Sequence, residues 1–354
     1  MRKNRFQRLN GVEILLRLSQ VVVIIVILIG LINTIIIGRY TSSQWATLVF
    51  AGLAQGSIYA LIALGYTLVY GILLMINFAH GEVFMAGAVS TVFVAMAFDR
   101  SGFLNANPLL AIMILMLIAA AVSTSIALLL ERIAYRPLRN APRLIPLITA
   151  IGASFVLQYT FRGLFGTQFR AYPEIQWLTE DFTIFGFSAP RVQPVVFVAA
   201  LGLMLALYYY VEKTRTGKAM RAVSEDKDVA RLMGINIDKI IVSTFALGGA
   251  LAGAAAIFNG LFRPPGVYYF MGFFPGIKAF TAAVLGGIGS IPGAMIGGLL
   301  LGLIESLGPN AILEGLGVPA ANQLKDAIAF TVLVLILIFR PQGIFGERLA
   351  EKKA

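Results

Sequence analysis

Apolar segments of roughly 20 residues recur along the whole chain, and charged residues are nearly confined to the short stretches between them. Only 13% of the 354 residues are charged and 58% are hydrophobic, whereas a soluble domain carries roughly 25% charged residues. Ten membrane-spanning helices of about 20 residues would occupy about 200 residues, close to the hydrophobic content. The pattern excludes an ordinary soluble enzyme, a disordered chain and a disulfide scaffold. It predicts an all-α polytopic membrane protein.

The residue types that are missing restrict the chemistry. The chain has no cysteine and a single histidine, His80, which excludes thiol nucleophiles, thiolate zinc sites and multi-histidine metal sites. No Gly-Lys-Ser or Gly-Lys-Thr occurs, and in Gly217-Lys218-Ala219 the alanine has no hydroxyl for magnesium. We therefore predict that this chain is not an enzyme and holds no cofactor or metal. Any energy from ATP would therefore have to enter through another subunit, which would bind the ATP and Mg²⁺.

About ten spans are predicted within a single transmembrane domain, 1–354. The first apolar run is too long for a signal peptide and lacks a small-x-small cleavage site, so we expect it to be retained. The predicted spans are Leu18–Gly38, two spans with irregular backbone between them in Ala46–Phe98, Leu109–Leu130, Leu144–Phe161, Pro194–Val211, Ile241–Leu261, a Gly-rich pair of spans or half-spans in Phe274–Leu307, and Lys325–Phe339.

The formal charge of +11 could suggest nucleic acid, but its distribution indicates an orientation in the membrane. With ten crossings every strongly basic stretch falls on one side, which is the positive-inside pattern. These stretches are the N-terminus 1–17, the turn 131–143, the loop 212–240 and the tail 340–354. We expect both termini in the cytoplasm. Arg39, the turn Arg263-Pro264-Pro265 and an aromatic interfacial loop, 162–193, would lie outside.

Two Gly-rich regions, Gly52–Ala88 and Gly286–Gly302, fall in opposite halves of a five-plus-five arrangement. An odd number of spans per half would invert the second half, and matching interrupted segments indicate a transport pathway. Glycine can also serve only close helix packing, and the sequence leaves both interpretations open.

Polar residues cluster in the apolar segment at Asn77-Phe78-Ala79-His80-Gly81-Glu82. A break between half-helices would expose backbone groups to a polar path. Alternatively, Asn77 and His80 cap helix ends and Glu82 sits in a first turn, where the helix dipole favours an anion. Both interpretations stay open. The candidate pathway residues are Gln55, Tyr59, Asn77, Phe78, His80 and Glu82. Asn259 and Glu305 are weaker candidates, and Glu305 has no obvious partner.

The loop 212–240 is long, polar and patterned like a short helix. Ser224 could cap a helix that opens with Glu225 and Asp226, and Gly234 suits its left-handed C-terminal residue. A solvated cytoplasmic helix and a docking surface for a peripheral partner both fit this loop.

Five segments together resemble the branched-chain amino acid ABC transporter permeases, in particular the smaller of the two permease types. They are GSIYALIALG at 56–65, NFAHG at 77–81, RTGKAMRA at 215–222, FALGGALAG at 245–253 and RPQGIFG at 340–346. The longer charged N-terminus and the external segment 161–193 depart from the family pattern and leave the substrate in doubt.

The resemblance implies a permease subunit of an importer in a prokaryotic inner membrane, working by alternating access. Its partners would be a second related permease, two cytoplasmic ATPase subunits, an extracytoplasmic binding protein and membrane lipid, with no nucleic acid. The loop 216–234 would be the coupling helix, with candidate coupling residues Thr216, Gly217, Arg221, Glu225, Asp226, Arg231 and Gly234.

The substrate would be branched-chain or other neutral amino acids, or alternatively urea or short amides. A partner-independent small-solute channel, and then a proton-coupled carrier using His80, Glu82 and Glu305, are the other hypotheses.

Overall fold

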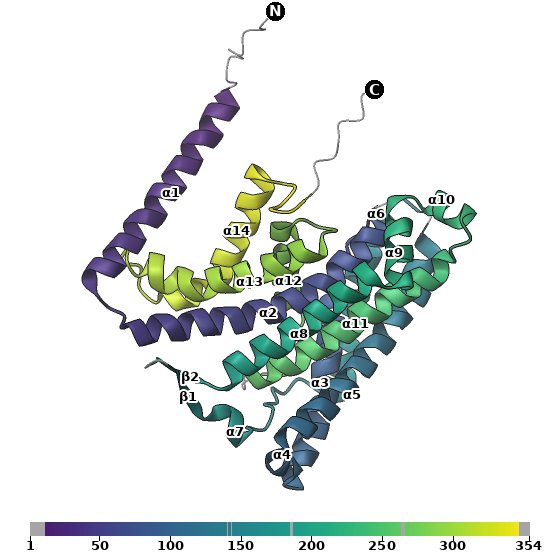
Figure 1. The fold of residues 1–354 in the computed structure, drawn as a ribbon, viewed down its shortest axis with the longest axis horizontal. Helices are drawn as coiled ribbons and strands as arrows, with labels where there is room; N and C mark the ends of the chain where they lie inside the picture. Colours follow the sequence, from purple (N-terminus) through teal and green to yellow (C-terminus); the bar gives the residue numbers. More distant parts are fainter. Residues whose placement is uncertain (1–10, 140, 143, 185–186, 263–265, 347–354) are drawn as a thin grey trace, which may run out of the picture.

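The structure, a computed structural model, describes residues 11–139, 141–142, 144–184, 187–262 and 266–346. These residues form a helical bundle with one small β-hairpin at its edge (Figure 1). The α-helices are α1 (Gly11–Ile37), α2 (Ser42–Leu73), α3 (His80–Arg100), α4 (Phe103–Ala106), α5 (Pro108–Leu130), α6 (Leu144–Phe165), α7 (Gln176–Thr179), α8 (Val192–Lys213), α9 (Arg215–Glu225), α10 (Lys227–Leu232), α11 (Ile237–Phe262), α12 (Phe273–Gly286), α13 (Ile291–Gly308) and α14 (Lys325–Phe339).

The all-α polytopic prediction is confirmed. Within the described ranges nine helices are long and apolar enough to cross a membrane, and α12 is a shorter apolar helix. Each predicted span coincides with a helix or a pair of helices: Ala46–Phe98 holds α2 and α3, and Phe274–Leu307 holds α12 and α13. The predictions made for residues 1–10, 263–265 and 347–354 lie outside the described residues.

Small residues bring the central helices into contact. Helix α2 crosses the middle of the bundle and packs along α13, where Gly302 lies against the backbone of Gly56 (Figure 1). Helix α11 packs on α5 in the same way, with Gly253 against the backbone of Ala119. Close approach of this kind is how helices pack in lipid, where the hydrophobic effect does not drive them together. Helices α1 and α14 are mostly exposed, at the periphery.

The two halves of the chain use corresponding contacts. The α2–α13 pair matches α11–α5, and the α3–α5 pair matches α12–α13. Both α5 and α13 continue into a π-helical turn, Glu131–Tyr135 and Pro309–Leu313, and a 3₁₀ turn follows each, at Arg136–Leu138 and Ala321–Leu324. Since five of these spans precede α8, matched helices run in opposite directions. The arrangement supports the predicted inverted five-plus-five repeat.

The segment predicted as an external aromatic loop contains more structure than expected. Strands β1 (Asp181–Ile184) and β2 (Phe187–Pro190) pair antiparallel, with Asp181 opposite Pro190. The Tyr172 hydroxyl donates to the carbonyl of Ala88 at 2.9 Å, which ties the loop to α3. Arg191 pairs with Glu180 at 2.6 Å.

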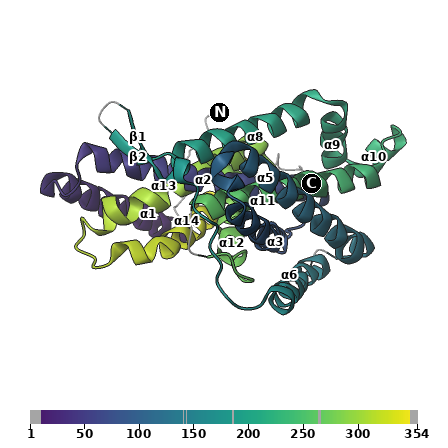
Figure 2. The ribbon, with the colours of Figure 1, turned by 90° about the horizontal axis from the view of Figure 1, so that it is seen from below.

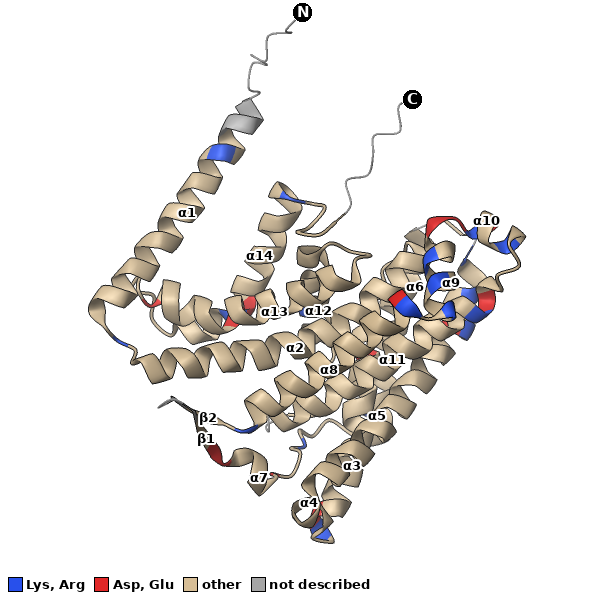
Figure 3. Ribbon diagram, in the orientation of Figure 1, with Lys and Arg blue, Asp and Glu red and all other residues tan. Residues whose placement is uncertain are grey.

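Charged side chains gather at one end of the bundle. Figure 3 shows many Lys, Arg, Asp and Glu residues on and around α9 and α10, whereas the long helices carry few, some of them beside α13 and α14. Arg139 forms ion pairs with Glu131 and with Asp238, joining the turn after α5 to the start of α11. Burial and the nearby Arg139 lower the pKa of Lys227 in α10.

Candidate functional site

The predicted break in the helices lies between α2 and α3. Helix α2 ends at Leu73, and Leu74 adopts a left-handed conformation with φ 54° while its N–H donates to the Tyr70 carbonyl. Helix α3 begins at His80, whose N–H donates to the Asn77 carbonyl at 3.0 Å. Residues 74–79 therefore connect two helices of 32 and 21 residues, each long enough to cross a membrane, rather than the two half-helices that the sequence suggests.

Neither Asn77 nor His80 caps a helix through its side chain, so that part of the sequence interpretation is wrong. Helix α3 has Ala79 at its N-cap and no side-chain cap. The Asn77 side chain instead accepts a hydrogen bond from the Tyr135 hydroxyl at 2.6 Å, which joins the break to the π-turn after α5. Because the Asn77 side chain is engaged in this contact with Tyr135, it does not cap a helix.

Tyr135→Phe is expected to lower the free energy of unfolding by about 1–3 kcal/mol, because the buried Asn77 amide oxygen loses the hydroxyl that donates to it. Thermal unfolding of the purified chain in detergent measures the change. Tyr208→Phe on α8 is the matched control, since Tyr208 is 41% exposed. Equal thermal stability of the Tyr135 variant and the unmodified chain would contradict this assignment.

His80 fills a notch between two glycines. Its ring lies against Gly65 of α2 and Gly248 of α11, so closely that a methyl group at Gly65 would overlap the imidazole. The ring also meets Tyr66 edge-to-face, with centroids 5.1 Å apart. His80 is thus packed among α2, α3 and α11 rather than along an open path.

Glu82 lies in the first turn of α3, as predicted, and its carboxylate points to α6. Its Oε1 atom accepts hydrogen bonds from the Gln158 amide at 2.7 Å and from the Ser154 hydroxyl at 3.2 Å. Its Oε2 atom is buried without a hydrogen-bond partner among the described residues. Sequence reasoning missed Ser154 and Gln158, although their four-residue spacing would have placed both on one face of α6.

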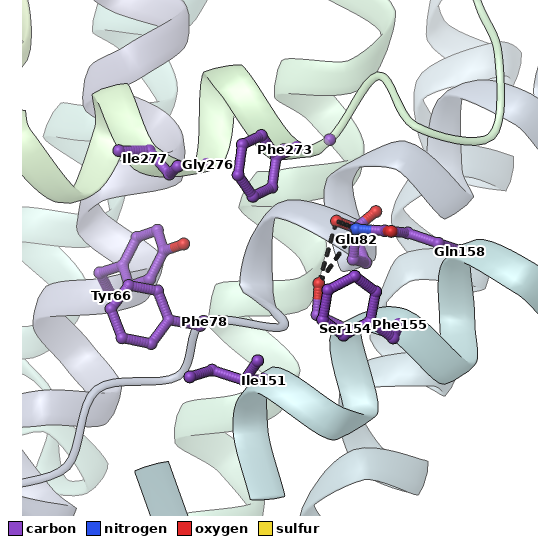
Figure 4. Close-up of a pocket in the computed structure, with 11 residues that line it drawn as sticks. Tyr66, Phe78, Glu82, Ile151, Ser154, Phe155, Gln158, Phe273, Gly276 and Ile277 are labelled. Atoms are coloured by element: carbon purple, nitrogen blue, oxygen red, sulfur yellow. Dashed lines mark hydrogen bonds between the residues drawn. The ribbon is translucent and has the colours of Figure 1, made fainter. Parts of the chain in front are cut away.

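A cavity of about 250 Å³ lies beside this carboxylate (Figure 4). Its polar side is Glu82, Ser154 and Gln158, and the remaining wall is mostly apolar. The apolar side chains are those of Tyr66, Phe78, Ile151, Phe155, Phe273 and Ile277. Four helices, α2, α3, α6 and α12, and the connection 74–79 therefore line a small cavity with one polar corner.

The starts of α3 and α12 meet at the same cavity. Gly81 and Gly276 are so close that a Cβ on Gly276 would lie 3.0 Å from the Gly81 Cα atom. Figure 2 shows α3 and α12 near the middle of the molecule, with α6 to one side. Two interrupted segments, one from each half of the repeat, thus converge as expected for a transport pathway.

The other candidate pathway residues lie away from this cavity. Phe78 and Glu82 line it, whereas Asn77 and His80 are packed as described above. Tyr59 lies in the core of α2, and its hydroxyl accepts a hydrogen bond from Lys278 at 3.3 Å. Gln55 is 5% exposed on the same helix. Of the six candidates, two thus line the cavity and the other four are buried away from it.

Glu305 has a clear partner, contrary to the sequence interpretation. Lys278 of α12 lies 2.7 Å from Glu305 of α13 and 2.5 Å from Asp326 of α14. Lys278 and Glu305 are both nearly fully buried. The lone lysine within the predicted span pair Phe274–Leu307 was the available signal, since a buried lysine requires an acid nearby.

The charged end of the molecule carries two short helices, α9 and α10, which form the predicted coupling loop. Thr214 caps α9 by accepting from the Gly217 N–H at 3.1 Å. The cap of α10 is Asp226, which accepts from the N–H groups of Asp228 and Val229 at 2.8 and 3.0 Å. The predicted cap, Ser224, is wrong, because its hydroxyl donates back to the Arg221 carbonyl within α9.

The candidate coupling residues differ in where they face. Gly217 is buried, and a Cβ there would overlap the backbone of Val211 at the end of α8. Arg221 pairs with Glu212, and Gly234 takes the expected left-handed conformation with φ 83°. Thr216 is half-buried, and the outward-facing members are Glu225, Asp226, Arg231 and Gly234.

Three large apolar side chains are exposed on and just after α10. Val229 is 55%, Leu232 87% and Met233 78% exposed. Ala230, on the opposite side of α10, is buried. We call Val229, Leu232 and Met233 the α10 tip.

A sequence model of the branched-chain amino acid transport system permease component matches residues 48–337. The chain belongs to this family. The permease is 44% identical to the high-affinity branched-chain amino acid transport system permease protein LivH of Salmonella typhimurium, over 86% of this chain and 96% of the relative. It is also 44% identical to the corresponding protein BraD of Pseudomonas aeruginosa, over 85% of this chain and 95% of the relative. With its apolar helices, the permease is a multi-pass membrane protein.

Proposed function

We propose that this permease is the membrane subunit of an ATP-driven importer for branched-chain or other neutral amino acids in a prokaryotic inner membrane. Two cytoplasmic ATPase subunits, a second related permease and an extracytoplasmic binding protein would complete the importer. Both termini would face the cytoplasm, because the basic stretches then obey the positive-inside rule. Family membership and the transport function of the named relatives LivH and BraD support the substrate class.

The α10 tip is the observation that carries the ATPase partnership. Three exposed apolar side chains surrounded by charged ones are typical of a protein interface, with an apolar centre and a polar rim. Capping by Thr214 and Asp226 fixes the two helices that present the tip. A channel that works without partners has no use for such a surface, so the tip favours an importer.

The packing gives a route from the α10 tip to the cavity. Helix α9 packs against α2, α8 and α11, and α10 leads through a short turn into α11. Helix α2 ends directly before the break, and α11 packs on α3. A movement of α9 and α10 driven by ATP binding would thus reach the start of α3, where the cavity alternates between the two sides of the membrane.

Leu232→Asp combined with Met233→Asp is expected to weaken ATPase binding by at least about thirtyfold. Losing two central apolar contacts costs about 2 kcal/mol or more at an interface. The measurement is the amount of ATPase subunit that co-purifies with this chain in detergent, together with ATP-driven leucine uptake. Trp177→Asp is the matched control, because Trp177 is 38% exposed in α7, at the other end of the molecule.

Two results would overturn the proposal. One is full retention of the ATPase subunits and full uptake by the double variant. The other is leucine uptake into liposomes by this chain alone without ATP, which would make it a channel or carrier. A panel of leucine, valine, alanine and urea in the same assay distinguishes an amino acid importer from an importer of short amides.

A further inference from the structure

In the described part of the chain, the buried carboxylate of Glu82 has hydrogen-bond donors for only one of its two oxygen atoms. Glu82 is only 1% exposed, and Gln158 and Ser154 both donate hydrogen bonds to the same oxygen atom of its carboxylate. The second oxygen has no hydrogen-bond partner among the described residues, and none of the residues that line the cavity is basic. Figure 4 shows the carboxylate at the wall of the cavity, beside Gln158 and Ser154.

Burial disfavours an ionised carboxylate unless a cation or further hydrogen bonds stabilise it. The dipole of α3, in whose first turn Glu82 lies, offsets only part of this cost. A purely structural link between α3 and α6 would not require a charge, since a glutamine at position 82 could also accept from Gln158 and Ser154. Burial alone favours the neutral acid, whereas an ammonium group at the unused oxygen would keep the carboxylate ionised, so the site is suited to a cationic ligand.

The rest of the cavity limits what that cation can be. Phe155 lies beside Ser154, and Phe78 and Phe273 supply further apolar side chains to the lining. The cavity volume of about 250 Å³ is below the roughly 300–1,000 Å³ of sites for drug-sized ligands. Phe155 and Phe273 are 51% and 38% exposed, so the cavity opens between α6 and α12. The site fits a small aliphatic molecule with an ammonium group at one end.

We propose that Glu82, oriented by Gln158 and Ser154, binds the α-ammonium group of an aliphatic amino acid as it passes through the permease. The ammonium group would donate to the free Oε2 atom, and the aliphatic side chain would lie against the apolar wall. The α-carboxylate, for which the lining residues offer no cation, would point to the opening between α6 and α12. This subsite rests on the proposed function and adds to it a selectivity for molecules that carry an ammonium group. Urea can donate hydrogen bonds to the carboxylate but carries no positive charge to balance it, and an aliphatic acid without an ammonium group supplies neither.

The absence of cysteine from the chain permits a direct test in the complete transporter complex. Phe155→Cys places one thiol at the mouth of the cavity. The measured quantity is the ratio of two modification rates of this thiol: the rate with cationic 2-aminoethyl methanethiosulfonate over the rate with neutral propyl methanethiosulfonate. We expect Glu82→Gln to lower this ratio about tenfold. Leu109→Cys on the exposed face of α5 is the control thiol, whose ratio should not change.

Protection by ligands identifies the group that binds. Leucine and 3-methylbutylamine should slow modification of the thiol introduced by Phe155→Cys, whereas 4-methylpentanoate, which lacks the ammonium group, should not. Equal protection by the acid and the amine, or an unchanged rate ratio after Glu82→Gln, would overturn the subsite. If Glu82→Gln prevents folding, the variants Ser154→Ala and Glu82→Asp are used instead. Both displace the carboxylate but keep its charge. Both should weaken protection by the amine.

Uptake completes the test and separates the two proposals. Glu82→Gln should lower ATP-driven leucine uptake at least about tenfold, while leucine binding to the isolated binding protein and co-purification of the ATPases stay unchanged. Glu180→Gln, an exposed external carboxylate, should leave uptake unchanged. Failure of the unmodified complex to take up leucine would overturn the proposed function, even with the rate ratio as expected. Normal uptake by Glu82→Gln would overturn only the subsite.

Discussion

Gly302→Leu is expected to prevent this permease from forming a stable bundle. Even a methyl group at Gly302 would overlap the backbone of Gly56, so a leucine side chain would force α2 and α13 apart. These helices form the largest contact between helices in the described residues. Helix α2 also contributes Tyr59 and the glycine, Gly65, against which the His80 ring packs. Overpacking by a few methylenes costs about 1–3 kcal/mol in a core that can adjust. Here the obstacle is backbone, so we expect at least about 3 kcal/mol.

The measurement is the yield of monodisperse protein after detergent extraction, together with the midpoint of thermal unfolding. Gly202→Leu on α8 is the matched control, because a Cβ at Gly202 meets nothing within 4 Å. Both variants add the same apolar side chain to a glycine in a membrane helix. A normal yield and midpoint for the Gly302 variant would show that α2 and α13 do not rely on this crossing.

The spans and the break could be predicted from the sequence because they depend on local patterns. The length of an apolar run determines whether a helix can cross a membrane, and α5 and α14 begin within one residue of their predicted starts. The polar cluster of Asn77, His80 and Glu82 marked the interruption between α2 and α3, because such residues are unfavourable in a continuous apolar helix.

The partners of the buried polar residues could not be predicted, because they lie far away in the sequence. Glu82 meets Gln158 on α6, and Glu305 meets Lys278 on α12. A local pattern can mark a residue as buried, as the lone lysine, Lys278, does, but which residues pair depends on how the helices are placed side by side. The same reason explains why Asn77 was interpreted as a helix cap. Its actual partner, Tyr135, is 58 residues away in a π-turn that has no simple sequence signal.

The buried lysine of α12 gives the second large prediction. Lys278 is surrounded by Glu305, Asp326 and the ring of Tyr59, whose centroid is 5.6 Å from the ammonium nitrogen. Removing one member of a buried ion pair costs about 3–5 kcal/mol, because a charge stays behind without its partner. Lys278→Met is therefore expected to destabilise the permease by about that amount, and to loosen the first turn of α14.

The double variant Lys278→Met with Glu305→Gln separates the value of the charge pair from the value of packing. With both buried charges removed, much of the lost stability should return, since replacing a whole buried pair is often nearly neutral. Asp326→Asn should cost at most about 1 kcal/mol, because Asp326 is 53% exposed and its charge is solvated. Unfolding midpoints of all three variants in detergent measure these differences. A double variant as unstable as Lys278→Met alone would contradict this account and would instead assign the lysine a packing role between α12 and α14.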